Sequence, residues 1–300
     1  MNFNLALAQY PIHLYKSEAE WIKNLDKWFS EAKNAGANIL CFPEYASMEL
    51  VSLIPSHEKM NVKEQLVNLQ QLHGKFLNTF IEMSIKYSVY VVAPSFPFLA
   101  GKKYYNRSYL LSPTGNYDFQ DKIHMTRFED DWGISPAETE LKIFETSFGR
   151  LAIQICLDIE FPWASSLLAG SDVNLILVPS CTETLHGLNR VHIGARARAL
   201  ENQVYIGVSQ VVGDSPWSLA VDINNGYAAL YGPVDTTFPE DGIIESGNLN
   251  QFKWLVTKIE TLKLKPIREN GQVFNFKLSS KYPWALASQG SLALKTIKLL

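Results

Sequence analysis

Four short stretches of the sequence contain, at or near the end of an apolar run, side chains that can do chemistry. They are NILCFPEY with Glu44, FQDKIHMTRFED with Lys122 and Glu129, LAIQICLD with Cys156, and VNLILVPSCTE with Ser180 and Cys181. In open α/β sheets, ligands bind beyond the carboxyl ends of strands, so such groups are candidates for one shared site. Each stretch alone is weak evidence, because a cysteine at a strand end more often serves packing than chemistry.

Taken together, these residue types match the requirements of amide hydrolysis. The reaction needs a nucleophile, a base for its proton, a positive group near the developing oxyanion and an acid for the departing amine. A free thiol has a pKa of about 8.5, so little of it is thiolate at neutral pH without help. A glutamate could take the thiol proton, pass it to ammonia and then activate water against the thioester. A lysine and a backbone N–H beside the cysteine could hold the oxyanion.

Three of the polar residues also have a simpler interpretation. Asp158 would cap the helix that follows it. Glu44, after a proline, would be a solvated turn residue, and Lys122 beside Asp121 would form an ordinary surface ion pair. Catalytic roles would be favoured over these simpler interpretations only if the residues come together in the folded protein.

Two alternatives concern the thiol and its base. Cys181 also follows an apolar run, but no apolar–Cys–x–Asp pattern surrounds it, and we expect it to line the pocket with Ser180. Cys41 lies inside NILCF and is expected in the core. His124 is the usual kind of base for a thiol. It lies two residues from Lys122, so in a strand both would face one side, and we expect it to be a neighbour of the site rather than the base.

A metal-binding alternative can be assembled from ligand-type residues after the last apolar run. They are Cys181, Glu183, His186 and His192. Their spacing matches no zinc signature, so no metal is expected. The sequence contains neither GxxxxGK[ST] nor GxGxxG, and we therefore expect no phosphate-bearing cofactor and no cofactor of any other kind.

The composition restricts the class of protein that positions these groups. The 300 residues are 47% hydrophobic and 19% charged, which is typical of a soluble globular protein with one sizeable core. A net charge of −3 without a dense Lys/Arg run predicts no nucleic-acid partner. No apolar run is long enough to span a bilayer, and the N-terminus lacks the features of a signal peptide. Three widely spaced cysteines argue against a disulfide framework, so we expect a cytoplasmic protein.

The order of predicted elements indicates a mixed α/β layered domain. Strands are expected at 3–12, 38–42, 90–96, 107–115, 172–180, 204–213 and 253–262, and helices at 17–37, 62–87 and 190–203. The run 141–156 predicts a hairpin with its turn at 147–149, and NNG at 224–226 predicts a second hairpin turn. Strands alternate with helices early and pair as hairpins later, which favours layers of helices on mixed sheets.

Three of the stretches resemble the nitrilase superfamily of carbon–nitrogen hydrolases. They are FPEY at 42–45, DKIHMTRFE at 121–129 and ICLDIEFP at 155–162, in the order of that superfamily and at spacings that it tolerates. PTG before the lysine, and VPSCT and RARALEN after the cysteine, are also similar, so the resemblance covers most of the chain. It looks closest to a bacterial branch of undefined substrate, sometimes fused to an acetyltransferase-like domain that would not fit here.

The resemblance implies a four-layer α-β-β-α sandwich, with two central mixed sheets flanked by helices. It implies that Glu44 is the general base and acid, Lys122 the oxyanion-stabilising cation and Cys156 the nucleophile. It also implies that Glu129 is a second glutamate that orients the substrate or the base, with Asp130 as the competing position.

Four residues are expected to contact the substrate. They are Tyr45, Leu157, Ser180 and Cys181. Leu157 departs from the superfamily, which often has an aromatic or polar residue straight after the nucleophile. Its backbone N–H can still serve as an oxyanion donor.

We therefore expect an amidase that cleaves a small carboxylic amide through a thioester on Cys156 and releases ammonia or an amine. A nitrilase or N-carbamoyl amine hydrolase with the same residues is one alternative. An inactive sandwich that acts as a binding protein is another, although a buried cation, carboxylate and thiol are costly to retain without purpose. The resemblance implies a hydrolase domain at 1–270 and a homodimer or higher homo-oligomer. Residues 271–300 would form a C-terminal extension that packs on the partner subunit.

Overall fold

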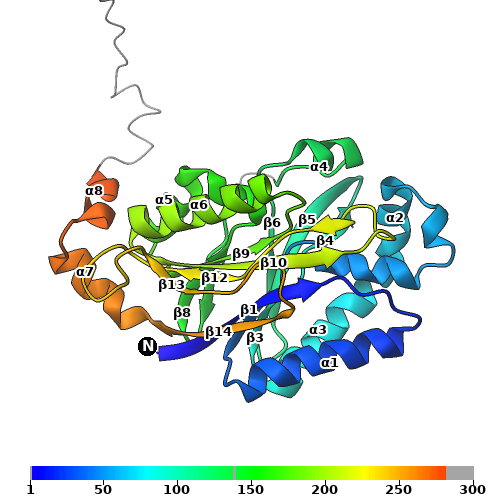
Figure 1. The fold of residues 1–300 in the computed structure, drawn as a ribbon, viewed down its shortest axis with the longest axis horizontal. Helices are drawn as coiled ribbons and strands as arrows, with labels where there is room; N and C mark the ends of the chain where they lie inside the picture. Colours follow the sequence, from blue (N-terminus) through cyan, green and yellow to red (C-terminus); the bar gives the residue numbers. More distant parts are fainter. Residues whose placement is uncertain (1, 138–139, 282–300) are drawn as a thin grey trace, which may run out of the picture.

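The computed structural model describes residues 2–137 and 140–281 and shows strands layered between helices (Figure 1). The helices are α1 (Glu18–Asn34), α2 (Val62–Leu69), α3 (His73–Tyr87), α4 (Arg127–Trp132), α5 (Pro162–Gly170), α6 (Leu185–Asn202), α7 (Leu264–Asn270) and α8 (Asn275–Lys281). Short 3₁₀ helices are η1 (Ala46–Leu53), η2 (His57–Lys59), η3 (Gln70–Leu72), η4 (Cys156–Glu160) and η5 (Thr261–Lys263). None of the helices in the described ranges is long and apolar enough to cross a bilayer.

The first sheet is built around the N-terminal strand. Its strands are β1 (Asn2–Pro11), β2 (Ile39–Cys41), β3 (Tyr90–Val92), β4 (Phe96–Ala100), β5 (Lys103–Leu111), β6 (Tyr117–Asp121) and β14 (Lys253–Glu260). Strands β1, β2 and β3 run parallel, so the carboxyl ends of β2 and β3 lie at one edge. On the other side of β1, β14 pairs antiparallel over eight residues.

The second sheet is built around β10. Its strands are β7 (Phe144–Thr146), β8 (Gly149–Ile153), β9 (Leu175–Ser180), β10 (Tyr205–Asp214), β11 (Ile223–Asn224), β12 (Ala229–Tyr231) and β13 (Ile243–Ser246). Strands β8, β9 and β10 are parallel, and β7 forms the predicted hairpin with β8. Both sheets are therefore mixed, as predicted.

The two sheets join at one edge and stack elsewhere. All fourteen strands of the described chain are linked through hydrogen-bonded neighbours, but β1 and β10 pair only where Gln9–Pro11 meets Gln210–Val212. Away from this edge, a Cβ on Gly207 of β10 would lie 3.1 Å from methyl groups of Leu5 and Leu7 on β1. Glycine at this position lets the faces approach closely, and even a methyl group would require the leucine side chains to shift by a few tenths of an ångström.

Each strand face belongs to a different core, because side chains alternate along a strand. Leu5 and Leu7 lie in the core between the sheets, whereas Ala6 and Ala8 lie in the core that includes residues of α1 and α3. Figure 1 shows α1 and α3 on one side of the strands and α5 and α6 on the other. The predicted α-β-β-α sandwich is confirmed.

Helix α1 shows how local sequence produces the outer layer. Ser17 caps its N-terminus by accepting the backbone N–H of Glu20. Its apolar stripe, including Trp21 and Phe29, is buried against the first sheet. The helix ends just before Gly36, which has a φ of +82° and so lets the chain turn back into β2.

Two sequence-based predictions of elements are wrong. The single helix expected at 62–87 is broken by η3, where the Gln70 side chain donates to the carbonyl of Pro97 and accepts from the N–H of Leu99. The hairpin expected at 224–226 does not form, because β11 and β12 both pair with β10 rather than with each other. Asn225 is instead bound to the carbonyl of Thr182 through its N–H.

The C-terminal extension at 271–300 lies partly outside the described residues, which end at 281. Within the described part, α8 packs beside α5 and α6 of its own chain. The N–H of Phe276 donates to Gln203 at 3.1 Å, which fixes α8 to the end of α6. The division at residue 270 and the contact with a partner remain predictions.

Candidate active site

Cys156 lies on a sharp turn directly beyond β8. It begins η4 with a φ of +48°, a left-handed conformation that is uncommon for a residue with a side chain. The residue is only 6% exposed. Such backbone strain persists only where the surrounding structure holds it in place, and it is found most often at functional sites.

The carboxylate of Asp158 supplies part of that restraint. It accepts the backbone N–H of Ile155 at 3.3 Å, and the backbone N–H groups of Ile123 and His124 at 3.2 and 2.8 Å. The simpler interpretation of Asp158 as a cap for the following helix is therefore wrong for α5, because its side chain bonds to two other segments. One of these segments follows Lys122 and the other contains Cys156.

Glu44 follows the end of β2 and is 2% exposed. Its Oε1 lies 2.8 Å from Nζ of Lys122. Its Oε2 accepts the backbone N–H of Cys181 at 3.0 Å. The solvated-turn reading of Glu44 is wrong, since the carboxylate is buried and bonded on both oxygens.

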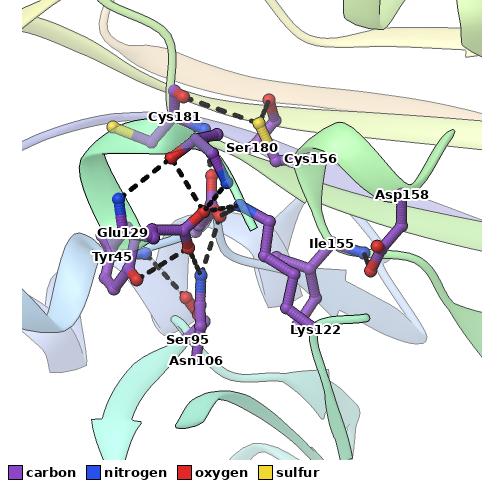
Figure 2. Close-up of polar contacts among 12 residues, drawn as sticks. Tyr45, Ser95, Asn106, Lys122, Glu129, Ile155, Cys156, Asp158, Ser180 and Cys181 are labelled. Carbon is purple, nitrogen blue, oxygen red and sulfur yellow. Dashed lines mark hydrogen bonds and ion pairs between the residues drawn. The ribbon is translucent and has the colours of Figure 1, made fainter. Parts of the chain in front are cut away.

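Lys122 stands between two carboxylates, as Figure 2 shows for its ammonium group. It follows β6, and its Nζ lies 2.7 Å from Oε2 of Glu129 in addition to the contact with Glu44. Glu129 is held at the start of α4 by a capping box, in which Thr126 and Glu129 bond to each other's backbone N–H. The structure places Glu129 in the site and leaves Asp130 exposed.

Asn106 bridges the two carboxylates, a role that sequence analysis missed. It lies on β5, and its side-chain amide donates to Glu44 at 2.8 Å and to Glu129 at 2.9 Å. Its backbone carbonyl accepts the N–H of Lys122. The only signal in the sequence was an asparagine directly before the predicted strand at 107–115. Without the fold, a buried asparagine cannot be distinguished from an exposed one.

The surroundings shift the pKa values of the two carboxylates in opposite directions. Burial raises the pKa of Glu44, and the nearby charge of Glu129 raises it further, against the lowering effect of Lys122. Burial also acts on Glu129, but Lys122, the backbone N–H of Thr126 and the amide of Asn106 outweigh it and lower the pKa of Glu129. Burial opposes the charge on Lys122, yet the two glutamates raise its pKa well above the ordinary value. Glu44 is thus the carboxylate suited to exchange a proton.

The model of the carbon–nitrogen hydrolase family matches residues 4–247 of the chain. The chain belongs to the carbon–nitrogen hydrolase family. The predictions of the superfamily and of a hydrolase are therefore confirmed.

Known proteins similar to this carbon–nitrogen hydrolase include a probable hydrolase and proteins named as amidases. Probable hydrolase YhcX of Bacillus subtilis is 29% identical over 273 residues, which cover 91% of this chain and 53% of YhcX. The chain thus spans about half the length of that relative. Omega-amidase NIT2 of Homo sapiens is 23% identical over 94% of this chain and 97% of its own. The solved amidase of Nesterenkonia sp. has a TM-score of 0.66 at 18% identity, covering 93% of this chain and 96% of its own.

The structure of this carbon–nitrogen hydrolase places the remaining predicted residues as follows. The hydroxyl of Tyr45 donates to Glu129 at 2.9 Å, and Leu157 is half-buried next to Cys156. Ser180 ends β9 and Cys181 follows it, and both lie beside the Cys156 sulfur (Figure 2). The catalytic and substrate-binding roles remain predictions, but the polar groups assigned to them come together in one place.

The competing thiols and the competing base are engaged in other contacts. Cys41 is fully buried in the core, as predicted. The thiol of Cys181 bonds to Asn224 at 3.1 Å. The ring of His124 bonds to Asp158 at 2.9 Å and stacks on Phe161, so its Nδ1 is engaged away from the sulfur.

The metal-binding alternative loses one of its four ligands. Nδ1 of His192 lies 2.7 Å from the hydroxyl of Tyr231, and its Nε2 lies 2.9 Å from Oε1 of Gln210. Burial lowers the pKa of His192 to about 4, so the ring is neutral and bonded through both nitrogens within the protein. Across residues 2–137 and 140–281, no group of three or more His, Cys, Asp or Glu is arranged to hold a metal ion.

Proposed function

We propose that this carbon–nitrogen hydrolase is an amidase that cleaves a small carboxylic amide through a thioester on Cys156. The observation that carries the proposal is the convergence of Glu44, Lys122 and Cys156 from three separate loops. The ammonium lies 2.8 Å from Glu44. The sulfur is close enough to both that Glu44 raises and Lys122 lowers the pKa of the thiol.

The arrangement supports a definite sequence of steps. Glu44 takes the proton of the Cys156 thiol, and the sulfur forms a bond to the amide carbon while the carbonyl electrons move onto oxygen. Lys122 and the backbone N–H of Leu157 hold that oxyanion. As the C–N bond breaks, Glu44 returns the proton to the departing nitrogen. Glu44 then removes a proton from water, which attacks the thioester carbon. The C–S bond breaks to release the carboxylic acid, and Glu44 passes the proton to the departing sulfur.

The electrostatics support Glu44 as both acid and base. Burial, followed by the charge of Glu44, raises the pKa of the Cys156 thiol, so the resting sulfur is protonated. Burial raises the pKa of Glu44 as well, which makes its carboxylate a stronger base than an exposed glutamate. Glu129 and Lys122 stay charged throughout and supply a fixed field.

Similar proteins favour an amide over a nitrile or a carbamoyl amine. NIT2 is named an omega-amidase, and the Nesterenkonia protein is named an amidase. A glutamine variant of the latter shows covalent addition of the acetamide moiety of fluoroacetamide at its active-site cysteine. A neutral amide of a small carboxylic acid is therefore the substrate class proposed here.

Surface features support the proposed homodimer through the helices of one outer layer. Leu167 of α5 is 55% exposed and Ile193 of α6 is 69% exposed, so large apolar side chains face outward from adjacent helices. Burying such side chains against a second copy would be favourable. All three cysteines are free, which supports the proposed cytoplasmic location.

The proposed function is tested by measuring product release from a panel of short ω-amides, carbamoyl amines and aliphatic nitriles. We expect ammonia from one or more amides, and a Cys156→Ala variant that folds but releases none. Turnover of nitriles or carbamoyl amines alone would replace the proposal with the corresponding alternative. Undiminished turnover by Cys156→Ala would remove the thioester mechanism.

A further inference from the structure

The sulfur of Cys156 has two protein partners of opposite kind, both from the end of β9. The hydroxyl of Ser180 lies 3.2 Å from Sγ and donates its O–H to the sulfur. The backbone carbonyl of Cys181 lies 3.6 Å from Sγ and accepts the S–H. Figure 2 shows both residues beside the sulfur.

These two contacts favour different protonation states of the thiol. A carbonyl oxygen can only accept, so its bond to the sulfur exists only while the sulfur carries a proton. An O–H donor bonds more strongly once the sulfur is anionic, because charge-assisted hydrogen bonds are roughly twice as strong as neutral ones. Loss of the thiol proton therefore strengthens the contact with Ser180 and weakens the contact with Cys181.

We propose that Ser180 is a further catalytic residue, which stabilises the Cys156 thiolate. When the S–H bond breaks, the proton passes to Glu44 and the electron pair stays on sulfur, where the Ser180 hydroxyl donates to it and keeps its own proton. The same bond forms again when water displaces the thiolate from the acyl carbon. This role rests on the proposed nucleophile and replaces the earlier expectation that Ser180 contacts the substrate.

The position of Ser180 suits a fixed donor rather than an adaptable pocket residue. Its side chain is fully buried. Its backbone is held in β9, where it pairs with Gln210 of β10. A buried hydroxyl on a paired strand loses little freedom on bonding, so the donor is already aimed at the sulfur before the proton leaves.

Other charged and titratable groups also act on the sulfur. Glu44 from the loop after β2 and the Cys181 thiol just after β9 lie near it, and so does Lys122 from the loop after β6. Glu44 disfavours the thiolate, whereas Lys122 and the Ser180 hydroxyl favour it. Replacing Ser180 by alanine removes one of the favourable contacts and leaves the charged residues in place.

The test is the rate at which iodoacetamide alkylates Cys156 as a function of pH, followed by intact mass and peptide mapping of the full chain. Because the reagent reacts with the thiolate, its pH profile reports the pKa of the thiol without an amide substrate. In Ser180→Ala we expect the profile to move up by about one pH unit, with a rate about tenfold lower below the inflection. Ser180→Thr keeps the hydroxyl and should stay close to wild type.

Ser209→Ala is the matched control. Ser209 is also fully buried, lies on the neighbouring strand β10 opposite Pro179, and donates to the carbonyl of Ala8 at 2.8 Å. Its loss costs one buried hydrogen bond without touching the sulfur, so the pH profile should not move. An unchanged profile in Ser180→Ala, or an equal shift in Ser209→Ala or Ser180→Thr, would overturn the role of Ser180 alone. A wild-type Cys156 that resists alkylation would instead overturn the proposed nucleophile.

Discussion

The carboxylate of Asp158 accepts the backbone N–H of His124 at 2.8 Å, and this contact joins the Lys122 loop to the turn that carries Cys156. The same carboxylate accepts the N–H of Ile155, the residue before the nucleophile. Two loops from different sheets are thus bonded to one buried side chain. We infer that Asp158 sets the distance between the sulfur and the ammonium group.

Asp158→Asn should therefore lower kcat/KM by about 100-fold. The NH2 group of the asparagine would face backbone N–H groups, which are also donors, and the lost hydrogen bonds would let the two loops separate. The change should act mostly on kcat, and steady-state kinetics will separate it from KM. His124→Phe is the matched control. It keeps the backbone N–H and the ring stacking on Phe161 but loses the ring contact with Asp158, so its effect should be much smaller. Equal losses in both variants would contradict the bridging role.

Glu44→Gln should reduce kcat by about 10³-fold, since an amide cannot take the thiol proton or return it to the leaving nitrogen. The shape of the pocket should hardly change. Single-turnover kinetics with mass detection of the acyl-enzyme provide the measurement, because both acylation and deacylation should slow. A variant with wild-type rates would show that another group is the base.

Lys122→Met should abolish most activity and also destabilise the fold. One oxyanion donor is worth about 3–4 kcal/mol of transition-state stabilisation. Removing one partner from a buried ion pair costs about 3–5 kcal/mol of unfolding free energy, because Glu44 and Glu129 are left without a counter-charge. The double variant Lys122→Met with Glu129→Gln should recover part of the stability in urea unfolding but none of the activity. Recovery of activity would argue against an oxyanion role.

Asn106→Asp should shift the pH dependence of kcat/KM. The native amide donates to the charged form of Glu44, so replacing it with a carboxylate removes a donor and adds a like charge. Both effects raise the pKa of Glu44 further, and the acid limb of the profile should move to higher pH. Ser108→Ala is the control, because Ser108 is buried two residues along the same strand and donates to the carbonyl of Ala93. A shift of equal size in the control would indicate a general loss of packing.

Glu49 predicts a pH dependence of stability that is independent of catalysis. It is buried beneath Tyr10 and Trp21, and burial raises its pKa from 4.5 to about 8. The folded state therefore binds the proton more tightly than the unfolded state. The resulting stability is fully present below pH 4.5 and is lost as the pH rises to about 8.

Glu49→Gln should remove this dependence. Relative to wild type, the variant should gain on the order of a few kcal/mol of unfolding free energy between pH 5 and pH 8. Urea unfolding of both proteins at these two pH values is the measurement. Parallel losses of stability in the two proteins would show that Glu49 does not titrate in this range.

The residues assigned to the chemical steps could be found from the sequence because their types are rare beside apolar runs. Glu44, Lys122 and Cys156 each follow a strand, and the carboxyl ends of neighbouring strands meet in space. Helix and strand periodicity likewise located most elements. These patterns are local, so they can be recognised without knowledge of the fold.

The residues that position the site could not be found in this way. Asn106 and Asp158 act through contacts with segments that are distant in sequence, and an asparagine or aspartate in a short polar stretch has many ordinary explanations. The hairpin turn predicted at NNG 224–226 was wrong for a similar reason. Its local turn propensity is outweighed by pairing of both flanking strands with β10 and by the bond from Asn225 to Thr182.

The pairing of β1 with β14 has a consequence for synthesis of the protein. Strand β1 leaves the ribosome long before its partner β14, which is complete only at Glu260. Until then one edge of β1 stays open to other chains, which is a hazard for aggregation. Truncation within β14 should therefore give insoluble protein even though every residue of the candidate active site has already been made.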